Sequence, residues 1–144
     1  MYQAPIALAQ FIEAQAPSYD AREVAPSTYQ ELEQARTLAR LPIWSGASAR
    51  TIWPSARHNF AFRAWHDAAH LFGRFAFDLA GETAACDFQC REMLARIGDN
   101  ATSRHWCDIL RAEIIGQAMH LAAHGDFPSD QAAFVEGYLA CAKR

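Results

Sequence analysis

The chain has 144 residues, of which 51% are hydrophobic and 20% are charged, and its formal net charge is −3. This length suits a single domain over residues 1–144, and the composition excludes disordered and collagen-like chains. A mildly acidic chain is a poor candidate for wrapping nucleic acid, so we expect no nucleic-acid partner.

Helix periodicity and helix-end signals dominate the chain. Alanine, the residue with the highest helix propensity, occupies 30 positions. Pro17 ends the first predicted helix, and Thr28 with Glu31 fits a capping box at the start of the second. The expected helices cover residues 4–16, 27–41, 55–80, 81–97, 102–124 and 128–141. No stretch shows strand alternation, so the sequence predicts an all-α fold, a single compact bundle of five or six helices.

Residues 42–55, between the second and third helices, are predicted as an irregular loop. The loop contains Gly46, two prolines, Trp44 and Trp53. Aromatic side chains in a long loop usually mean that the loop packs onto something. It either covers the core or forms a wall of a pocket, and its tryptophans are also candidates for anchoring a protein partner.

The third helix carries the residues best suited to chemistry. His66 and His70 stand one turn apart on one face, so their ring nitrogens can converge on one metal ion. Asp67 is a candidate for a further ligand, for a partner that positions a ligand, or for a catalytic proton acceptor. The alternative is that both histidines are ordinary surface or core residues.

This helix lies in a basic segment. Residues 36–74 carry six arginines and one acid, a charge of +5, whereas the segments on either side carry −4 each. Arg57, Arg63 and Arg74 are candidates for binding a carboxylate or phosphate, so the expected substrate is a small anionic molecule, with an aromatic ring as one option. The alternative is that these arginines pair with the acidic flanks.

Glu82 opens the fourth helix, after a predicted break at Gly81 that would turn the chain back toward the histidines. Two histidines and a carboxylate form a common three-ligand site, which leaves one position open for water or substrate. Such ligands suit a divalent metal, with zinc as the first expectation and iron and manganese as alternatives.

A second polar stripe runs along the fifth helix. Glu113, Gln117, His120 and His124 fall within about 60° of each other on a helical wheel. If the stripe faces the third helix, Glu113, His120 and His124 complete the pocket as catalytic proton-transfer groups or as ligands of a second metal. The alternative is a narrow strip that faces solvent.

The start of the chain lacks the basic leader of a secretory signal, and no run reaches the roughly 18 apolar residues that span a bilayer. We therefore expect a cytoplasmic protein without a membrane span, whose cysteines are reduced thiols. The alternative is a structural zinc site built from Cys86, Cys90 and Cys107 with His105. The fourth cysteine is Cys141.

His66-Asp67-x-x-His70, followed by eleven residues and then Glu82, resembles the HDxxH-x11-E motif of the ubiquinone-biosynthesis metal-binding family, that of the fourth coenzyme Q biosynthesis protein. The resemblance covers about residues 58–90. It implies an all-helical fold and a divalent metal, usually zinc, held by His66, Asp67, His70 and Glu82. It also implies a role in replacing the ring carboxyl group of a quinone precursor by hydroxyl. Gly116-Gln117 and residues 127–131 are similar in character to small uncharacterised phage proteins.

These observations support two classes of function. The first is a metalloenzyme with lyase, hydrolase or oxygenase chemistry on a small anionic substrate. The second is a non-catalytic helical binding or inhibitor module of a phage or mobile element, with a protein partner. A metal that only stabilises the fold is a third hypothesis.

Overall fold

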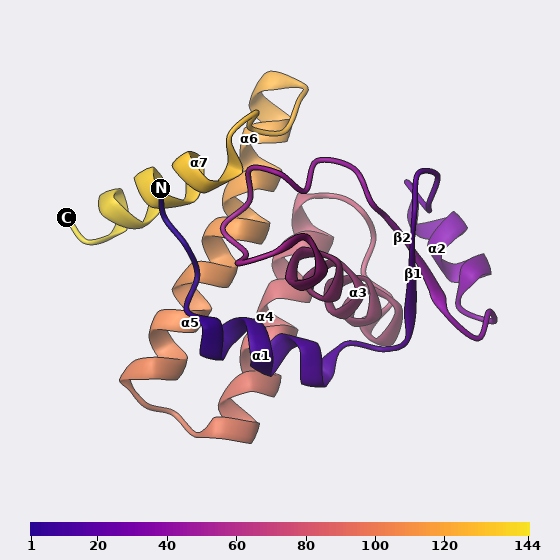
Figure 1. The fold of residues 1–144 in the computed structure, drawn as a ribbon, viewed down its shortest axis with the longest axis horizontal. Helices are drawn as coiled ribbons and strands as arrows, with labels where there is room; N and C mark the ends of the chain where they lie inside the picture. The colour runs from indigo at the N-terminus through magenta and orange to yellow at the C-terminus, as the bar shows by residue number, and fades with distance from the viewer.

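Helices account for 62% of residues 1–144, all of which the computed structural model describes. In chain order they are α1 (Ile6–Gln15), α2 (Tyr29–Ala35), α3 (Ala56–Gly73), α4 (Leu79–Ile97), α5 (Ala101–Arg111), η1 (Ala112–Gly116), α6 (Gln117–His124) and α7 (Gln131–Ala142), as Figure 1 shows. The helices α5, η1 and α6 follow one another without a break, so the chain has six separate helices. The prediction of a mostly helical chain is confirmed.

The prediction of a strictly all-α fold is wrong, because two short strands pair in parallel. Strand β1 (Tyr19–Arg22) lies beside β2 (Leu41–Trp44), with Tyr19 opposite Leu41, and α2 forms the crossover between them. The first three residues of β2 are buried, and Leu41 and Ile43 pack with Leu32 of α2 and Ala64 of α3. The strands form because this packing holds β2 in place beside β1.

Polar side chains begin most of the helices. The hydroxyl of Thr28 accepts a hydrogen bond from the backbone N–H of Glu31, which is one half of the predicted capping box, whereas the Glu31 carboxylate accepts from the backbone N–H of Ser27. The same kind of cap starts the other helices from α3 onward, apart from the continuation into η1 and α6, at Ser55, Asp78, Asn100 and Asp130. Each cap satisfies a backbone donor that the first helical turn leaves free.

The predicted boundary between the third and fourth helices is wrong by several residues. Helix α3 ends at Gly73, and Arg74 adopts the left-handed conformation with φ 55°. The backbone N–H of Phe75 then donates to the carbonyl of His70, which closes the turn. Gly81 lies in the first turn of α4, where a Cβ atom would overlap the carbonyl oxygen of Ala76. Gly81 is therefore required because the backbone of α4 approaches that of Ala76 closely, and it does not break the helix.

Helix α3 lies in the middle of the molecule. Figure 1 shows β1, β2 and α2 on one side of it and the α5–α6 run with α7 on the other. The main core joins α1, α3, α4, α5, η1 and α7 through fully buried side chains such as Leu8, Ile12, Met93 and Leu110. None of the helices combines the length and apolar character that crossing a membrane requires.

Candidate metal centre

Three predicted ligands meet between α3 and the first turn of α4. His66 Nε2 lies 2.7 Å from Glu82 Oε2, and His70 Nε2 lies 3.2 Å from the same oxygen. The two Nε2 atoms are 3.1 Å apart. The His70 side chain is fully buried, and those of His66 and Glu82 are only 15% and 24% exposed. This group of side chains could hold a metal ion.

The Nδ1 atom of each histidine ring lies within hydrogen-bond distance of an acceptor oxygen. His66 Nδ1 lies 2.8 Å from Gln89 Oε1, and His70 Nδ1 lies 2.9 Å from the carbonyl oxygen of Phe75. Carbonyl oxygens only accept hydrogen bonds, so each Nδ1 carries the hydrogen. In the neutral rings both Nε2 lone pairs therefore point at Glu82, which is the arrangement that metal-binding histidines show.

The spacing of the three ligand atoms fits a small divalent ion. Tetrahedral zinc with bonds of about 2.0–2.1 Å places its ligand atoms about 3.3 Å apart. The observed separations of 2.7–3.2 Å are shorter than this by about 0.1–0.6 Å. Two histidines and one carboxylate are the ligand set of many catalytic zinc sites, which keep a fourth position open.

The charges of the cluster also favour a cation between its ligands. Burial disfavours the charged form of Glu82, but when the rings are protonated, hydrogen bonds from His66 and His70 and their charges outweigh it and lower the pKa of Glu82 to about 2. Burial likewise disfavours the charged form of His66, yet the hydrogen bond and charge of Glu82 raise its pKa. Positive charge is therefore stabilised where the two Nε2 atoms meet the carboxylate.

Asp67, the fourth predicted ligand, lies outside this cluster. It lines the same cavity as the three ligands but is not part of the group that meets around one point. Burial raises the pKa of Asp67 to about 6, although the charges of His66 and His70 oppose the shift. The structure thus brings together three of the four ligands that the resemblance implies.

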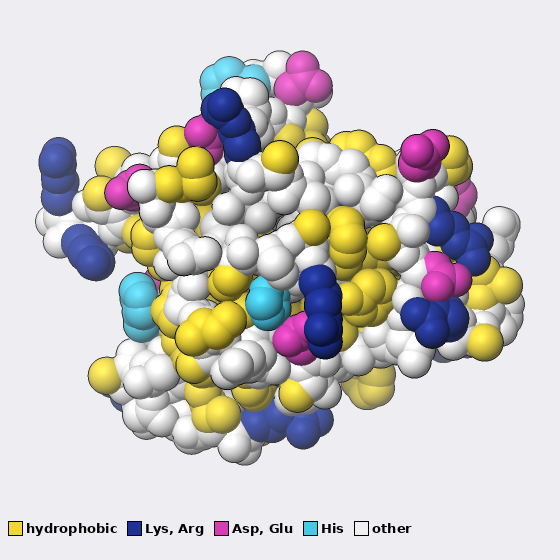
Figure 2. Space-filling view, in the orientation of Figure 1, with side chains coloured by type: hydrophobic (Ala, Val, Ile, Leu, Met, Phe, Trp, Pro, Cys, Tyr) yellow, Lys and Arg dark blue, Asp and Glu magenta, His cyan; other side chains and the backbone are white.

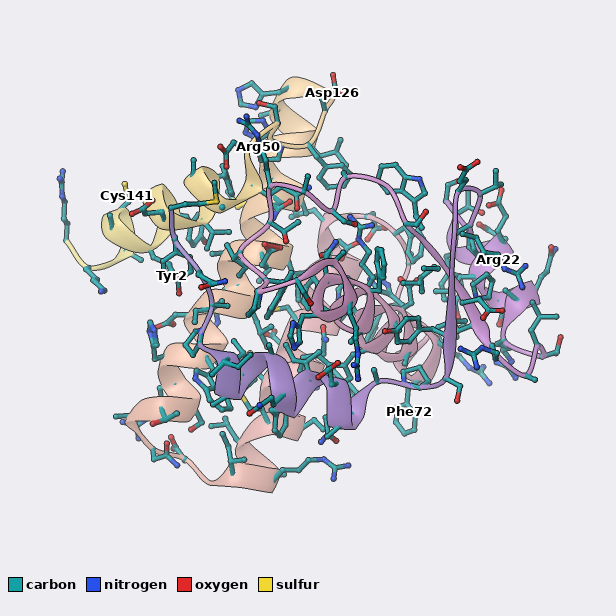
Figure 3. The ribbon with its side chains drawn as sticks, in the orientation of Figure 1. Tyr2, Arg22, Arg50, Phe72, Asp126 and Cys141 are labelled. Carbon is teal, nitrogen blue, oxygen red and sulfur yellow. The ribbon has the colours of Figure 1, made fainter.

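The cluster opens into a cavity of about 1370 Å³. This volume exceeds the ~300–1,000 Å³ of common small-molecule pockets. The walls come from residues 23–27, from Trp44 and the loop after it, from α3, from the start of α4, from one side of η1 and α6, and from the segment that joins α6 to α7. Arg50 and Asp126 are lining residues, and both lie beside α6 (Figure 3). The prediction of an irregular loop over residues 42–55 is wrong for 42–44, which belong to β2. Trp44 lines the cavity and Trp53 is buried in the main core, so the segment has both of its predicted roles.

Only one of the three arginines predicted to bind substrate lines the cavity. Arg57 pairs with Glu13 at 2.8 Å, and Arg74 lies exposed in the turn after α3. Arg63 is in the cavity wall, but its Nη1 donates to the carbonyl oxygens of residues 44 and 46, both at 2.6 Å. Its guanidinium therefore fastens the loop onto α3.

The predicted stripe on the fifth helix is divided by η1. Glu113 and Gln117 line the cavity and are joined by a hydrogen bond of 2.9 Å from Gln117 Nε2 to Glu113 Oε2. Glu113 and His66 line the same cavity, and the charge of His66 favours the ionised form of Glu113. The wider turn of η1 then rotates the following residues, and Ala118 and Leu121 continue the cavity wall.

His120 and His124 lie outside the cavity. Their rings stack with centroids 4.1 Å apart, and His124 Nδ1 donates to the carbonyl oxygen of His120. His124 is exposed, and Figure 2 shows histidine side chains on the surface at the end of α6. The structure therefore does not bring these histidines to the His66–His70 pair, and their position gives no support to a shared site.

Gln89 and the carbonyl group of Phe75 contact the histidine rings, and neither was assigned a role from the sequence. Gln89 lies seven residues after Glu82, so the two share a face of α4, and this spacing was the available signal. The Phe75 contact uses backbone, which no side-chain pattern reveals. Cys86, Cys90 and Cys107 are buried free thiols, and the only candidate metal group is the one at His66, so the alternative zinc site is not formed.

Comparison with family models, with curated proteins and with solved structures finds no match to the chain. The assignment of function therefore rests on the geometry of the site.

Proposed function

We propose that the protein is an enzyme that uses a divalent metal ion held by His66, His70 and Glu82. The observation that carries the proposal is the orientation of the two rings. Gln89 and the Phe75 carbonyl hold both Nδ1 atoms, so both Nε2 lone pairs face one carboxylate oxygen within 3.2 Å. Zinc is the first candidate, and iron and manganese suit the same ligands.

A large cavity at the ligands favours a catalytic over a structural role. Structural zinc sites use four protein ligands, whereas three ligands leave a position for water or substrate. When bound, the metal supplies Lewis-acid polarisation of a substrate oxygen or of water.

Asp67 is the proposed proton acceptor. Its pKa of about 6 leaves it mostly charged at neutral pH while keeping it basic enough to take up a proton. It lines the cavity beside the ligands without belonging to their cluster. A metal and an adjacent base support hydrolysis or lyase chemistry.

Metal analysis of protein purified without a polyhistidine tag tests the metal site. We expect about one equivalent of metal in the wild type, and its loss in His66→Ala and His70→Ala. His120→Ala and His124→Ala are matched controls, because they break a pair with the same spacing on the surface. Less than about a tenth of an equivalent, with no thermal shift on adding zinc, iron or manganese, rejects the proposal.

Chelation distinguishes a catalytic metal from a structural one. Several fully buried core side chains, such as Leu8, Ile12 and Leu110, come from α1 and α5, which carry none of the three ligands. We therefore expect the chelated protein to keep its helical circular dichroism signal and a cooperative melting transition. Unfolding on chelation at room temperature is the result that a structural metal predicts.

The quinone-precursor substrate implied by the ubiquinone-biosynthesis resemblance stays a prediction, and so does a non-catalytic role with a protein partner. A stoichiometric partner whose binding survives His66→Ala and His70→Ala would favour the non-catalytic role. The small anionic substrate expected from the basic segment has no support from the positions of the three arginines.

A further inference from the structure

A buried carboxyl group lies in the cavity wall without a full set of hydrogen bonds. Glu113 is 7% exposed, and its Oε2 accepts the hydrogen bond from Gln117. Its Oε1 is buried and has no hydrogen-bond partner. Burial raises the pKa of Glu113 to about 8, although the charge of Arg63 opposes the shift. A buried acceptor without a partner is costly, so this oxygen favours a donor from outside the chain.

The cavity lining is acidic. Six acidic side chains line it against two arginines, a formal charge of −4 when all six are ionised, and a divalent metal would reduce this to −2. The acids are Glu23, Asp67, Asp78, Glu82, Glu113 and Asp126. Arg63 offsets only part of this charge, through its interactions with Glu113 and Asp67. Arg63 donates to backbone carbonyl groups of the loop, and Arg50 lies 3.5 Å from Asp130.

Apolar surface lies close to the same carboxyl group. Trp44, Phe62 and Phe77 line the cavity, and Ile114 lines it next to Glu113 in the chain. Such walls bind the apolar body of a ligand, while a few polar groups fix its orientation. The cavity therefore combines an unpaired acid with a surface for a ring or an alkyl group.

We propose that the substrate is an amine whose ammonium group binds Glu113 Oε1 while its apolar part contacts the aromatic side chains of the cavity. This inference rests on the proposed metal enzyme and names the charge of its substrate. It gives Glu113 a role in binding, in place of the proton-transfer role expected from the sequence. The ammonium group supplies both the donor that Oε1 lacks and the positive charge that the lining lacks.

Binding of three small probes to the zinc-loaded protein tests the inference. Benzylamine, benzyl alcohol and benzoate share a ring but carry a positive, a neutral and a negative group. Their binding is followed at pH 8.5, where a carboxyl group with a pKa of about 8 is mostly ionised, by NMR of the Gln117 side-chain amide, which donates to Glu113. We expect benzylamine to bind at least about tenfold more tightly than benzyl alcohol, equivalent to about 1.4 kcal/mol. Benzoate should not shift these signals.

Two Glu→Gln variants locate the effect. Glu113→Gln should remove the preference for benzylamine, whereas Glu136→Gln, an exposed position on α7 with the same change of charge, should keep it. Equal or tighter binding of benzoate, a preference that survives Glu113→Gln, or no saturable binding of benzylamine would each overturn the inference. Zinc content is measured separately, so loss of the metal site is distinguished from loss of the amine site. Unchanged zinc binding in Glu113→Gln shows that the variant is folded.

Discussion

Replacing Gln89 by leucine tests how His66 is held for metal binding. Gln89 Oε1 is the hydrogen-bond partner of His66 Nδ1, at 2.8 Å. Gln89 is fully buried, so water does not readily take the place of the amide. Without the acceptor, the tautomer that carries its hydrogen on Nε2 competes, and that tautomer cannot bind a metal at Nε2.

The expected effect is large on metal affinity and small on the metal-free fold. Loss of such an outer contact typically weakens metal binding by about 10–100-fold, equivalent to about 1.4–2.8 kcal/mol. The Gln89 amide nitrogen is buried without a partner, and leucine removes that unfavourable group. We therefore expect the free energy of unfolding of the metal-free protein to change by less than about 2 kcal/mol.

Chelator competition measures the zinc affinity, and ¹⁵N NMR of the His66 ring reports its tautomer. The matched control is Gln117→Leu, which removes another buried glutamine in the cavity region that contacts none of the ligands. We expect this control to bind zinc with wild-type affinity. Wild-type zinc affinity in Gln89→Leu, or an equal loss in Gln117→Leu, would refute the positioning role.

Three further predictions concern the cavity walls. Asp67→Asn should bind zinc within about threefold of wild type, since Asp67 lies outside the three-ligand cluster, and chelator competition shows a larger loss if Asp67 is a ligand. The pKa of Glu113, about 8 in the folded chain and near 4.5 when unfolded, means that the folded state binds more protons between these values. Denaturant unfolding should therefore show that the wild type loses stability relative to Glu113→Gln as pH rises from about 4.5 to about 8. The expected loss in the free energy of unfolding is roughly 3–5 kcal/mol. A difference between the two proteins that does not change with pH contradicts the raised pKa of Glu113. Arg63→Met should lower the free energy of unfolding by about 2–3 kcal/mol, because it loses the hydrogen bonds to the loop. The control Arg57→Met, at an exposed position, should lower it by less than about 1 kcal/mol in the same assay. Equal losses in the two variants contradict this reasoning.

The pairing of His66 with His70 was predictable because helix geometry alone places residues four apart on one face. The approach of Glu82 was less predictable, because it depends on where the chain turns between two helices. That turn lies at residues 74–78, where Arg74 adopts a left-handed conformation that arginine rarely takes. The glycine that the sequence does contain, Gly81, lies seven residues later. It is required by its close packing against Ala76, which is a tertiary contact.

The prediction that the residues from Glu113 to His124 share one helix face was wrong for a related reason. The helical wheel assumes an unbroken α-helix, whereas residues 112–116 form a wider turn. Gly116 in this turn lies so close to α7 that a Cβ atom would approach the Tyr138 ring to 3.0 Å. The sequence periodicity of one helix does not reveal such a contact with another helix.

The two strands were missed because they are too short to show alternation. Each has four residues, and β2 contains a proline and has three buried residues in succession. Parallel pairing across α2 joins residues 22 positions apart, from Tyr19 to Leu41. Their stability comes from contacts with α2 and α3, which local sequence does not describe.

The closing turn between α3 and α4 has a consequence for the order in which the protein assembles. The three ligands and both groups that orient their rings lie within residues 66–89, on two helices joined by a five-residue connection. Only short loops must close to bring them together, and short-range contacts form early in folding. We therefore expect the metal-binding pair of helices to form before the α5–α6 run completes the far wall of the cavity. A metal captured at that stage would guide the folding of the rest of the chain around it.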